Sequence, residues 1–154
     1  MSPSSTQVEN LYLILWAVLS FWELGQIWFC QIVVYPLFAK VGEGDYVGYH
    51  RFYSKRIPLV VILPGFASFL LPIPLAMFGP AGPTWMSVAN IACGVVGLLV
   101  TLLLAIPRHN RLERGGKNAS TIAELVRYNW PRTISITIQA LVTVMMLVHV
   151  INAG

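Results

Sequence analysis

The sequence predicts an all-α integral membrane protein, a four-transmembrane-helix bundle that forms one domain over residues 1–154. Hydrophobic residues make up 56% of the chain and charged residues 10%, whereas a soluble domain carries about 25% charged residues. Apolar stretches recur that reach the length of about 20 residues needed to cross a bilayer core. Every Lys and Arg lies between these stretches or at their margins. The composition therefore favours a chain whose surface mostly faces lipid.

The four spans are expected at about 11–36, 57–78, 84–107 and 131–151. The link between the second and third spans runs from Gly79 to Pro83 and consists mainly of helix breakers, which predicts a tight turn. These two spans should therefore form an antiparallel hairpin. Prolines within the second span, among them Pro64 next to Gly65, predict that this helix is kinked.

The basic residues indicate how the spans are oriented. One group lies between the first and second spans or at their margin: Lys40, Arg51, Lys55 and Arg56. The other group lies between the third and fourth spans or at the start of the fourth: Arg108, Arg111, Arg114, Lys117, Arg127 and Arg132. Because cytoplasmic loops carry the excess of Lys and Arg, both loops are predicted to be cytoplasmic and both termini non-cytoplasmic. We expect a protein of a bacterial inner membrane, with no nucleic-acid partner for its net charge of +4.

Both cytoplasmic loops are expected to carry short interfacial helices. Asp45 can cap a helix that runs to about Lys55 and gathers tyrosines and His50 on one face. Thr121 and Glu124 have the spacing of a capping box that starts a second helix.

The two halves of the chain also look alike. Pro36 closes the first span and leads to His50, whereas Pro107 closes the third span and leads to Asn129. A duplicated helical hairpin and a chance similarity both explain this pattern, and the sequence does not choose between them.

Polar residues inside the spans are the first candidates for a site. Glu23 is the one acidic residue within a span, and an ionisable group at mid-membrane costs several kcal/mol, so it normally faces a bundle interior. Gln26 and Gln139 are expected at a comparable depth. The alternative for these amides is that they only join neighbouring helices, for about 0.6 kcal/mol each.

A second group of candidate site residues is expected at the cytoplasmic end of the bundle. Its members share this level by topology: Gln31, Tyr35, His50, Tyr53, Arg56, His109, Asn129, Trp130 and Arg132. Histidines and tyrosines around the mouth of one bundle can hold a substrate and move protons. The alternative is an ordinary interfacial belt, where Tyr, Trp and Arg collect in any membrane protein.

No cofactor is expected. A metal bound through Glu23, His50 and His109 is conceivable, but the sequence has no pair of histidines at metal-binding spacing. It also lacks the CxxC of a thiol oxidoreductase, a nucleotide-binding loop and a serine nucleophile elbow.

Four short motifs carry a resemblance to a known family. They are the segment from Gln31 to Leu37, the Tyr49-His50-x-x-Tyr53 loop, Pro107-x-His109, and the Asn129-Trp130-x-Arg132-Thr133 entry to the last span. Together they resemble a large family of small four-helix membrane proteins, a domain of unknown function that is grouped with the fungal anthrone oxygenases. The resemblance extends from about Gln31 to Thr133.

This resemblance implies a monooxygenase-type oxidoreductase that oxidises a flat apolar, polyketide- or quinone-like substrate with dioxygen and without a separate cofactor. His50 or His109 would be the general base, oriented by Gln31 or Asn129, with Glu23 as a further catalytic candidate. An oxyanion would be stabilised by Tyr53, Arg56 or Arg132. The substrate rings would stack on Trp130 and Tyr35, with Gln26 and Gln139 also contributing to binding.

Two other classes of function stay open. The first is a non-catalytic small membrane subunit that binds a lipid, quinone or pigment within a larger complex. The second is a small transporter or channel with Glu23 as a proton or cation site. In every case the lipid bilayer is a partner. In the enzymatic case a small aromatic substrate and dioxygen are partners as well, and the sequence leaves the oligomeric state undetermined.

Overall fold

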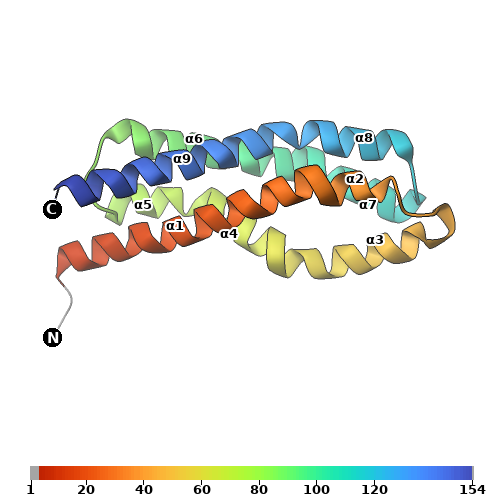
Figure 1. Cartoon of the computed structure of the whole chain (residues 1–154), viewed down its shortest axis with the longest axis horizontal. Helices are drawn as coiled ribbons and strands as arrows, with labels where there is room; N and C mark the ends of the chain where they lie inside the picture. Colours follow the sequence, from red (N-terminus) through yellow and green to blue (C-terminus); the bar gives the residue numbers. More distant parts are fainter. Residues whose placement is uncertain (1–3, 154) are drawn as a thin grey trace.

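The computed structural model describes residues 4–153, which form helices and short connections (Figure 1). Four of the helices are long and apolar enough to cross a membrane: Ser5–Phe38, Glu43–Phe78, Thr84–Gly115 and Ala119–Ala153. Large apolar side chains are exposed all along their outer faces, for example Leu59 and Ile151, which are 74% and 76% exposed. The all-helical fold and the four helices that are long and apolar enough to cross a membrane are therefore confirmed, and they indicate an integral membrane protein.

The long helices are divided by irregular turns into the following elements. The first contains α1 (Ser5–Phe29), η1 (Cys30–Val34) and α2 (Tyr35–Phe38). The second contains α3 (Glu43–Ile57), η2 (Pro58–Ile62), α4 (Leu63–Leu70) and α5 (Pro72–Phe78). The third contains α6 (Thr84–Val100), η3 (Thr101–Ala105) and α7 (Ile106–Gly115), and the fourth contains α8 (Ala119–Tyr128) and α9 (Trp130–Ala153). Here η denotes a π-helical turn.

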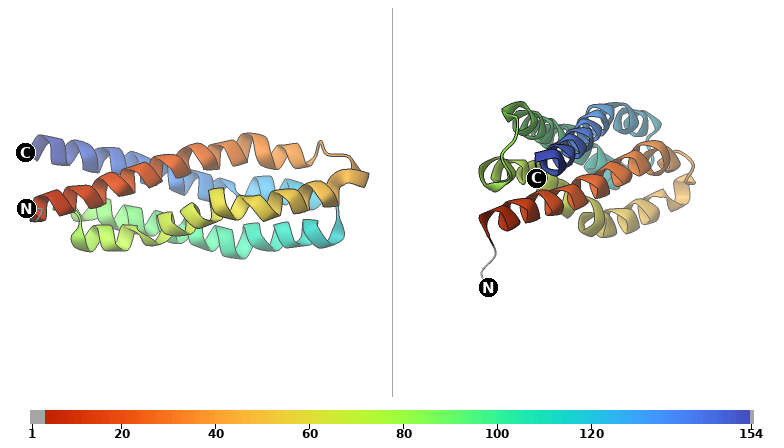
Figure 2. Two further views of the ribbon diagram at one scale, coloured as in Figure 1. Left: turned by 90° about the horizontal axis from the view of Figure 1, so that it is seen from below. Right: turned by 60° about the vertical axis from the view of Figure 1, so that its left-hand side comes forward.

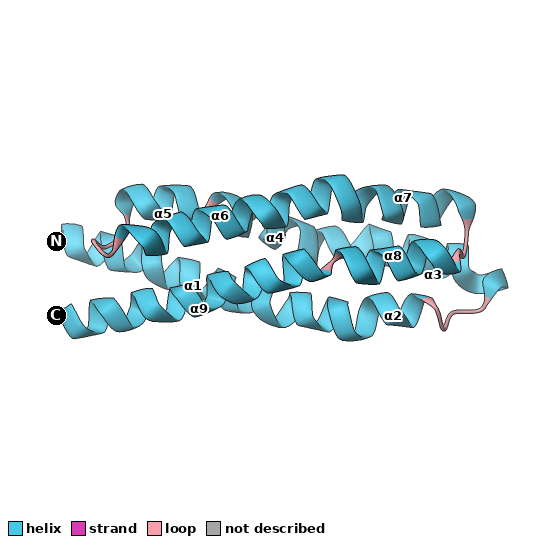
Figure 3. Cartoon of the chain, turned by 90° about the horizontal axis from the view of Figure 1, so that it is seen from above, coloured by secondary structure: helices cyan, strands magenta, loops and turns pink. Residues whose placement is uncertain are grey.

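The bundle has two distinct ends, which Figures 1 and 2 show from different directions. The start of α1, the α5–α6 turn and the end of α9 lie at one end, called the terminal end below. Helices α2, α3, α7 and α8 form the other, called the basic end because all ten Lys and Arg lie on or beside its helices. The connections are short loops (Figure 3).

The helices at the basic end differ from the expected interfacial helices because they continue the spans. Helix α3 runs directly into η2, and only Asn129 separates α8 from α9. Gly42, rather than Asp45, occupies the N-cap of α3. Asn118 caps α8, and its side chain accepts a hydrogen bond of 2.8 Å from the backbone N–H of Thr121. At 1.5 Å per residue the long helices measure about 50 Å, so they exceed a bilayer core of about 30 Å.

Three of the four long helices contain a π-turn, and each π-turn ends directly before a proline. The backbone N–H groups of Tyr35, Leu63 and Ile106 donate to carbonyls five residues back, namely those of Cys30, Pro58 and Thr101. The next residue in each case is a proline, which has no N–H to donate and crowds the preceding turn. The wider turn relieves that crowding, and π-turns of this kind occur frequently at functional sites.

The carbonyl that a proline leaves without its helical donor needs another partner inside a membrane. At Pro64 this is the carbonyl of Val60. It accepts hydrogen bonds from Gln26 Nε2 at 2.9 Å and from Trp22 Nε1 at 3.3 Å. The kink of the second helix is thereby tied to α1, and Gln26 acquires a structural role.

Close packing between α4 and α6 depends on Gly94. A Cβ at this position would lie 2.8 Å from the carbonyl oxygen of Phe69 and 3.3 Å from its Cα. These are backbone atoms that cannot rotate away, so a side chain would push the two helices apart.

We predict that Gly94→Ala lowers the stability of the bundle by about 1–3 kcal/mol, the usual cost of overpacking. Thermal unfolding in mild detergent measures the effect. Gly25→Ala is the matched control, because a Cβ at Gly25 would meet nothing within 4 Å. Equal unfolding temperatures for the two variants would show that α4 and α6 do not pack this closely.

Candidate functional site

Two histidines from different helices meet inside the basic end. His50 on α3 and His109 on α7 place Nε2 and Nδ1 3.3 Å apart. Such a pair needs one nitrogen that donates and one that accepts, so at least one ring carries no positive charge when the bond is formed. The other ring nitrogen of His50, Nδ1, lies 3.4 Å from the hydroxyl oxygen of Ser54. The position of His50 is therefore fixed by His109 and Ser54.

Aromatic rings enclose this pair. Tyr46 stacks on His50, with ring centroids 5.9 Å apart and planes inclined by 19°. Tyr53 stacks on His109 at 5.7 Å and 24°. Phe38 meets both imidazoles edge-on, at 5.4 Å and 6.0 Å. His50 is fully buried as a result, whereas His109 is partly exposed.

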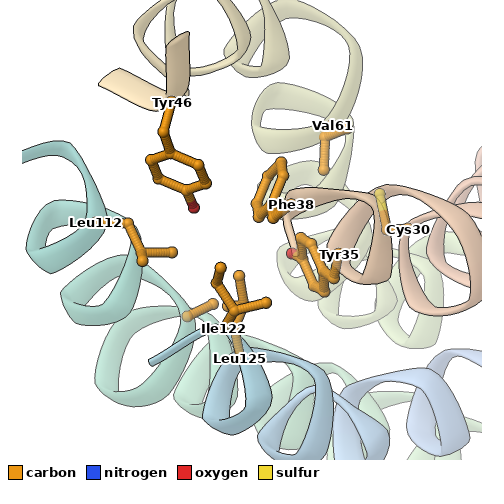
Figure 4. Packing of buried hydrophobic residues seen from close by; sticks show 9 residues of the cluster. Cys30, Tyr35, Phe38, Tyr46, Val61, Leu112, Ile122 and Leu125 are labelled. Carbon is orange, nitrogen blue, oxygen red and sulfur yellow. The ribbon is translucent and has the colours of Figure 1, made fainter. Parts of the chain in front are cut away.

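Apolar side chains from four long helices surround the same region (Figure 4). Tyr35 belongs to this cluster and lies 5.6 Å from His109 between ring centroids. The hydroxyl groups of Tyr35 and Tyr46 both point into the cluster (Figure 4). The Tyr46 hydroxyl is buried without a hydrogen-bond partner among the described residues. A polar group of this kind normally finds a partner, so the cluster has an unused hydrogen-bonding position beside His50.

Gln31 and Asn129 bond to each other rather than to the histidines. Asn129 Nδ2 donates to Gln31 Oε1 at 2.8 Å and to Thr133 Oγ1 at 3.2 Å. Gln31 Nε2 donates to the carbonyl of Val126 at 3.0 Å. This buried network joins η1 to the α8–α9 junction. The orienting role that the family resemblance implied for Gln31 and Asn129 does not appear in these contacts.

Glu23 lies apart from the histidines, in the middle of the bundle. It is 1% exposed, and neither carboxyl oxygen has a hydrogen-bond partner among the described residues. Its Oε2 faces Gly65, where a Cβ would come within 3.6 Å. Arg132 at the start of α9 is also buried, and its Nε likewise lacks a partner within the described chain. These two residues form no ion pair with each other.

Two further candidates from the sequence, Gln139 and Trp130, lie away from the histidine pair. Gln139 Nε2 donates to the carbonyls of Asn90 at 2.9 Å and Ser68 at 3.5 Å, so it joins α9 to α6 and α4. Trp130 packs edge-on against Trp28 at 5.8 Å, on the bundle surface and outside the aromatic cluster.

Arg56 is exposed, and its guanidinium lies 3.8 Å above the ring of Phe52. It is therefore not among the groups that surround the histidine pair.

Among the surface hollows at the basic end, two are relevant to the proposals below. The first, called the Tyr53 pocket, has a volume of about 280 Å³ and is lined by Tyr49, Phe52, Tyr53, Arg56, Ile57 and Val60. The second, called the α2–α8 groove, has a volume of about 790 Å³. Tyr53 is the link between the first pocket and the histidine pair, because its ring both lines the pocket and stacks on His109.

Glu23 does not join His50 and His109 in a metal-binding group, and residues 4–153 contain no cluster of three or more His, Cys, Asp or Glu suited to a metal ion. The expectation that no cofactor is needed stays a prediction. Ser54, Phe38 and Tyr46 are site residues that the sequence did not reveal. For Tyr46, its place on the same helical face as His50 was the available signal.

No family model, curated protein or solved structure matches the chain. The resemblance to the anthrone oxygenase family, and the activity that it implies, therefore stay predictions. The interpretation of the site depends on its own residues and their geometry.

Because the carboxyl group of Glu23 is buried without a partner, we predict that Glu23→Leu raises the stability of the bundle by about 1–3 kcal/mol, the usual cost of an unsatisfied polar group. Thermal unfolding in detergent measures this effect. Gln139→Leu is the contrasting variant and should lower stability, because Gln139 is hydrogen-bonded. A loss of stability in Glu23→Leu would show that the carboxyl group has a stabilising partner in the membrane.

Proposed function

We propose that this protein is a membrane-embedded oxidoreductase that oxidises a flat apolar substrate with dioxygen. One observation carries the proposal: the His50–His109 pair, 3.3 Å apart, is enclosed by aromatic rings, and the ring of Tyr53 both stacks on His109 and lines a surface pocket. A general base in an aromatic setting suits the removal of a proton from an acidic C–H group of an aromatic substrate.

In the proposed reaction His109 faces the substrate and His50 supports it. His109 takes a proton from a methylene group flanked by aromatic rings, and the contact between His109 Nδ1 and His50 Nε2 orients the accepting ring. The methylene carbon then gives an electron pair to dioxygen and becomes bonded to a peroxide. The distal oxygen of this peroxide takes the first proton back from His109. Loss of the second methylene proton to His109 and of the distal oxygen as hydroxide then leaves a ketone, and the hydroxide takes that proton to form water. The balance is one dioxygen consumed, with one ketone and one water formed.

The hydroxyl groups of the cluster suit the anionic stages. Deprotonation places negative charge on an oxygen of the substrate, and donors aimed at such an oxygen lower the barrier. The Tyr46 hydroxyl, which has no partner among the described residues, and the Tyr53 hydroxyl are the proposed donors. Apolar surroundings also concentrate dioxygen beside the carbanion.

The proposed orientation places the basic end at the cytoplasmic face and both termini on the opposite side. The distribution of all ten Lys and Arg supports it, because cytoplasmic segments carry the excess of these residues. The histidine pair would then lie near the cytoplasmic boundary of the membrane.

Replacing either histidine should abolish the proposed reaction. We expect His50→Gln and His109→Gln to lower the rate of anthrone oxidation by about 10²–10⁴-fold, the typical contribution of a general base. Absorbance of the anthraquinone product and oxygen uptake measure the rate.

His149→Gln is the control, since this residue lies beside Gly82 at the terminal end. Unfolding temperatures close to that of the unmodified protein confirm that each variant is folded. Full activity in both His50→Gln and His109→Gln would exclude the base assignment.

A second candidate function, a non-catalytic subunit that binds lipid, is favoured by the α2–α8 groove. Its lining combines apolar residues with two basic residues and one acidic residue: Pro36, Ala39, Glu43, Lys117, Ala119, Ile122, Ala123, Val126, Arg127 and Trp130. An acyl chain suits the apolar part, and Lys117 and Arg127 suit the phosphate of an anionic phospholipid.

For this candidate we expect Arg127→Gln combined with Lys117→Gln to reduce the amount of anionic phospholipid retained through purification. Lipid extraction and mass spectrometry measure the retained phosphatidylglycerol per protein. Arg114→Gln combined with Lys40→Gln is the matched control, because it removes the same charge from the same end outside the groove. Equal retention in the two double variants would exclude the groove as a lipid site.

A further inference from the structure

We propose that Arg56 is an anchor for an acidic group on the substrate, so that the Tyr53 pocket selects flat aromatic acids over neutral aromatic molecules. This inference rests on the proposed function and deepens it by naming the substrate class. It rests on three features that lie together: the guanidinium of Arg56, the apolar wall of the Tyr53 pocket, and the ring of Tyr53, which stacks on His109.

The wall of the Tyr53 pocket is largely apolar and carries a single charge. Of the six lining residues, Arg56 alone is charged, while Tyr49, Phe52, Tyr53, Ile57 and Val60 supply aromatic and aliphatic surface. The ion pairs formed within residues 4–153 join Arg108 and Arg111 to Glu124, and Arg56 takes part in neither. Its guanidinium is therefore available for a carboxylate, which it can bind through two parallel hydrogen bonds.

Arg56 is also held in place before any ligand arrives. Its guanidinium lies 3.8 Å from the centroid of the Phe52 ring, a close cation–π contact. A side chain that is already ordered loses less conformational freedom on binding. Stacking of this kind also leaves the edge of the guanidinium free to face an anion.

The position of Arg56 along its helix matches an amphipathic ligand. It is the last basic residue before the apolar stretch that begins at Ile57. A carboxylate bound here stays near the polar boundary, and the attached rings can lie against the aromatic side of the pocket, which Tyr49, Phe52 and Tyr53 form. Tyr53 lies three residues earlier on the same helical face and stacks on His109 at 5.7 Å. The rings are thus directed toward the proposed base.

The size of the pocket limits the substrate. Its volume of about 280 Å³ lies just below the range of about 300–1,000 Å³ typical of ligand sites. The pocket therefore suits two or three fused rings with one acidic substituent. The same guanidinium could also bind the carboxylate of a fatty acid or the phosphate of a lipid, and the experiment must distinguish these sources.

The test measures the binding of 2-naphthoate and 2-anthracenecarboxylate, together with their neutral carboxamides, to the full-length protein in detergent by ligand fluorescence. We expect each carboxylate to bind about tenfold more tightly than its carboxamide, since a charge-assisted hydrogen bond is stronger than a neutral one and solvent weakens it here. In Arg56→Gln the ratio should fall to about one, whereas Arg56→Lys should keep part of it. Arg51→Gln is the matched control, an exposed arginine on the same helix outside the pocket, and should keep the full ratio.

Decanoate and vesicles containing phosphatidylglycerol serve as competitors. Weak competition by both supports the proposal. Displacement of the aromatic carboxylate by either one at equal concentration overturns it in favour of a fatty-acid or lipid headgroup site. An unchanged ratio in Arg56→Gln, equal affinities in the unmodified protein, or no binding of either probe also overturns it.

Failure of this inference differs from failure of the proposed function. Binding through Arg56 is measured without turnover, so a preserved carboxylate preference with full activity in both histidine variants would remove only the base assignment. Loss of activity in the histidine variants with no carboxylate preference would remove only the acidic anchor.

Discussion

A lipid environment offers no water to a free backbone group, and most of this structure follows from that constraint. Three prolines interrupt the hydrogen-bond ladders of three helices, and each helix responds with a π-turn. One residue from each turn, Cys30, Val61 and Ala105, then packs into the same core cluster as Tyr35 and Phe38. The irregular backbone thus adjoins the aromatic cluster whose Phe38 packs against both histidines.

The same constraint separates polar side chains that hold the bundle together from those that are free to react. Gln31, Asn129 and Gln139 are buried with their amides hydrogen-bonded across helices, so they fix how the helices are placed. Glu23 is as deeply buried but has no partner among the described residues. An unsatisfied group costs stability and therefore suggests a role beyond packing. In this respect Glu23 is the residue that the proposed chemistry leaves unexplained.

The sequence predicted the spans and the tight turn at Gly79–Pro83 because long apolar runs and helix breakers have direct structural consequences. Topology also placed His50 and His109 at one level. Their contact at 3.3 Å was beyond prediction, because it depends on the rotation of α3 and α7 about their axes. The same limit applies to Trp130, whose edge-on contact with Trp28 the sequence did not predict. The π-turns were missed because hydropathy patterns carry no information about a five-residue hydrogen-bond step.

The length of the helices indicates where the histidine pair lies relative to the membrane core. Helices of about 50 Å cannot lie wholly within a core of about 30 Å, so roughly 20 Å must extend beyond it. We infer that the basic end is the extending part, because it holds all the Lys and Arg. At that end Leu112, Ile122 and Leu125 are buried in the same cluster as Phe38, which packs against both histidines. These leucines and isoleucine lie in segments that resemble ordinary loops in the sequence, yet they extend the apolar core of the bundle to the level of the histidine pair, where the proposed reaction would take place.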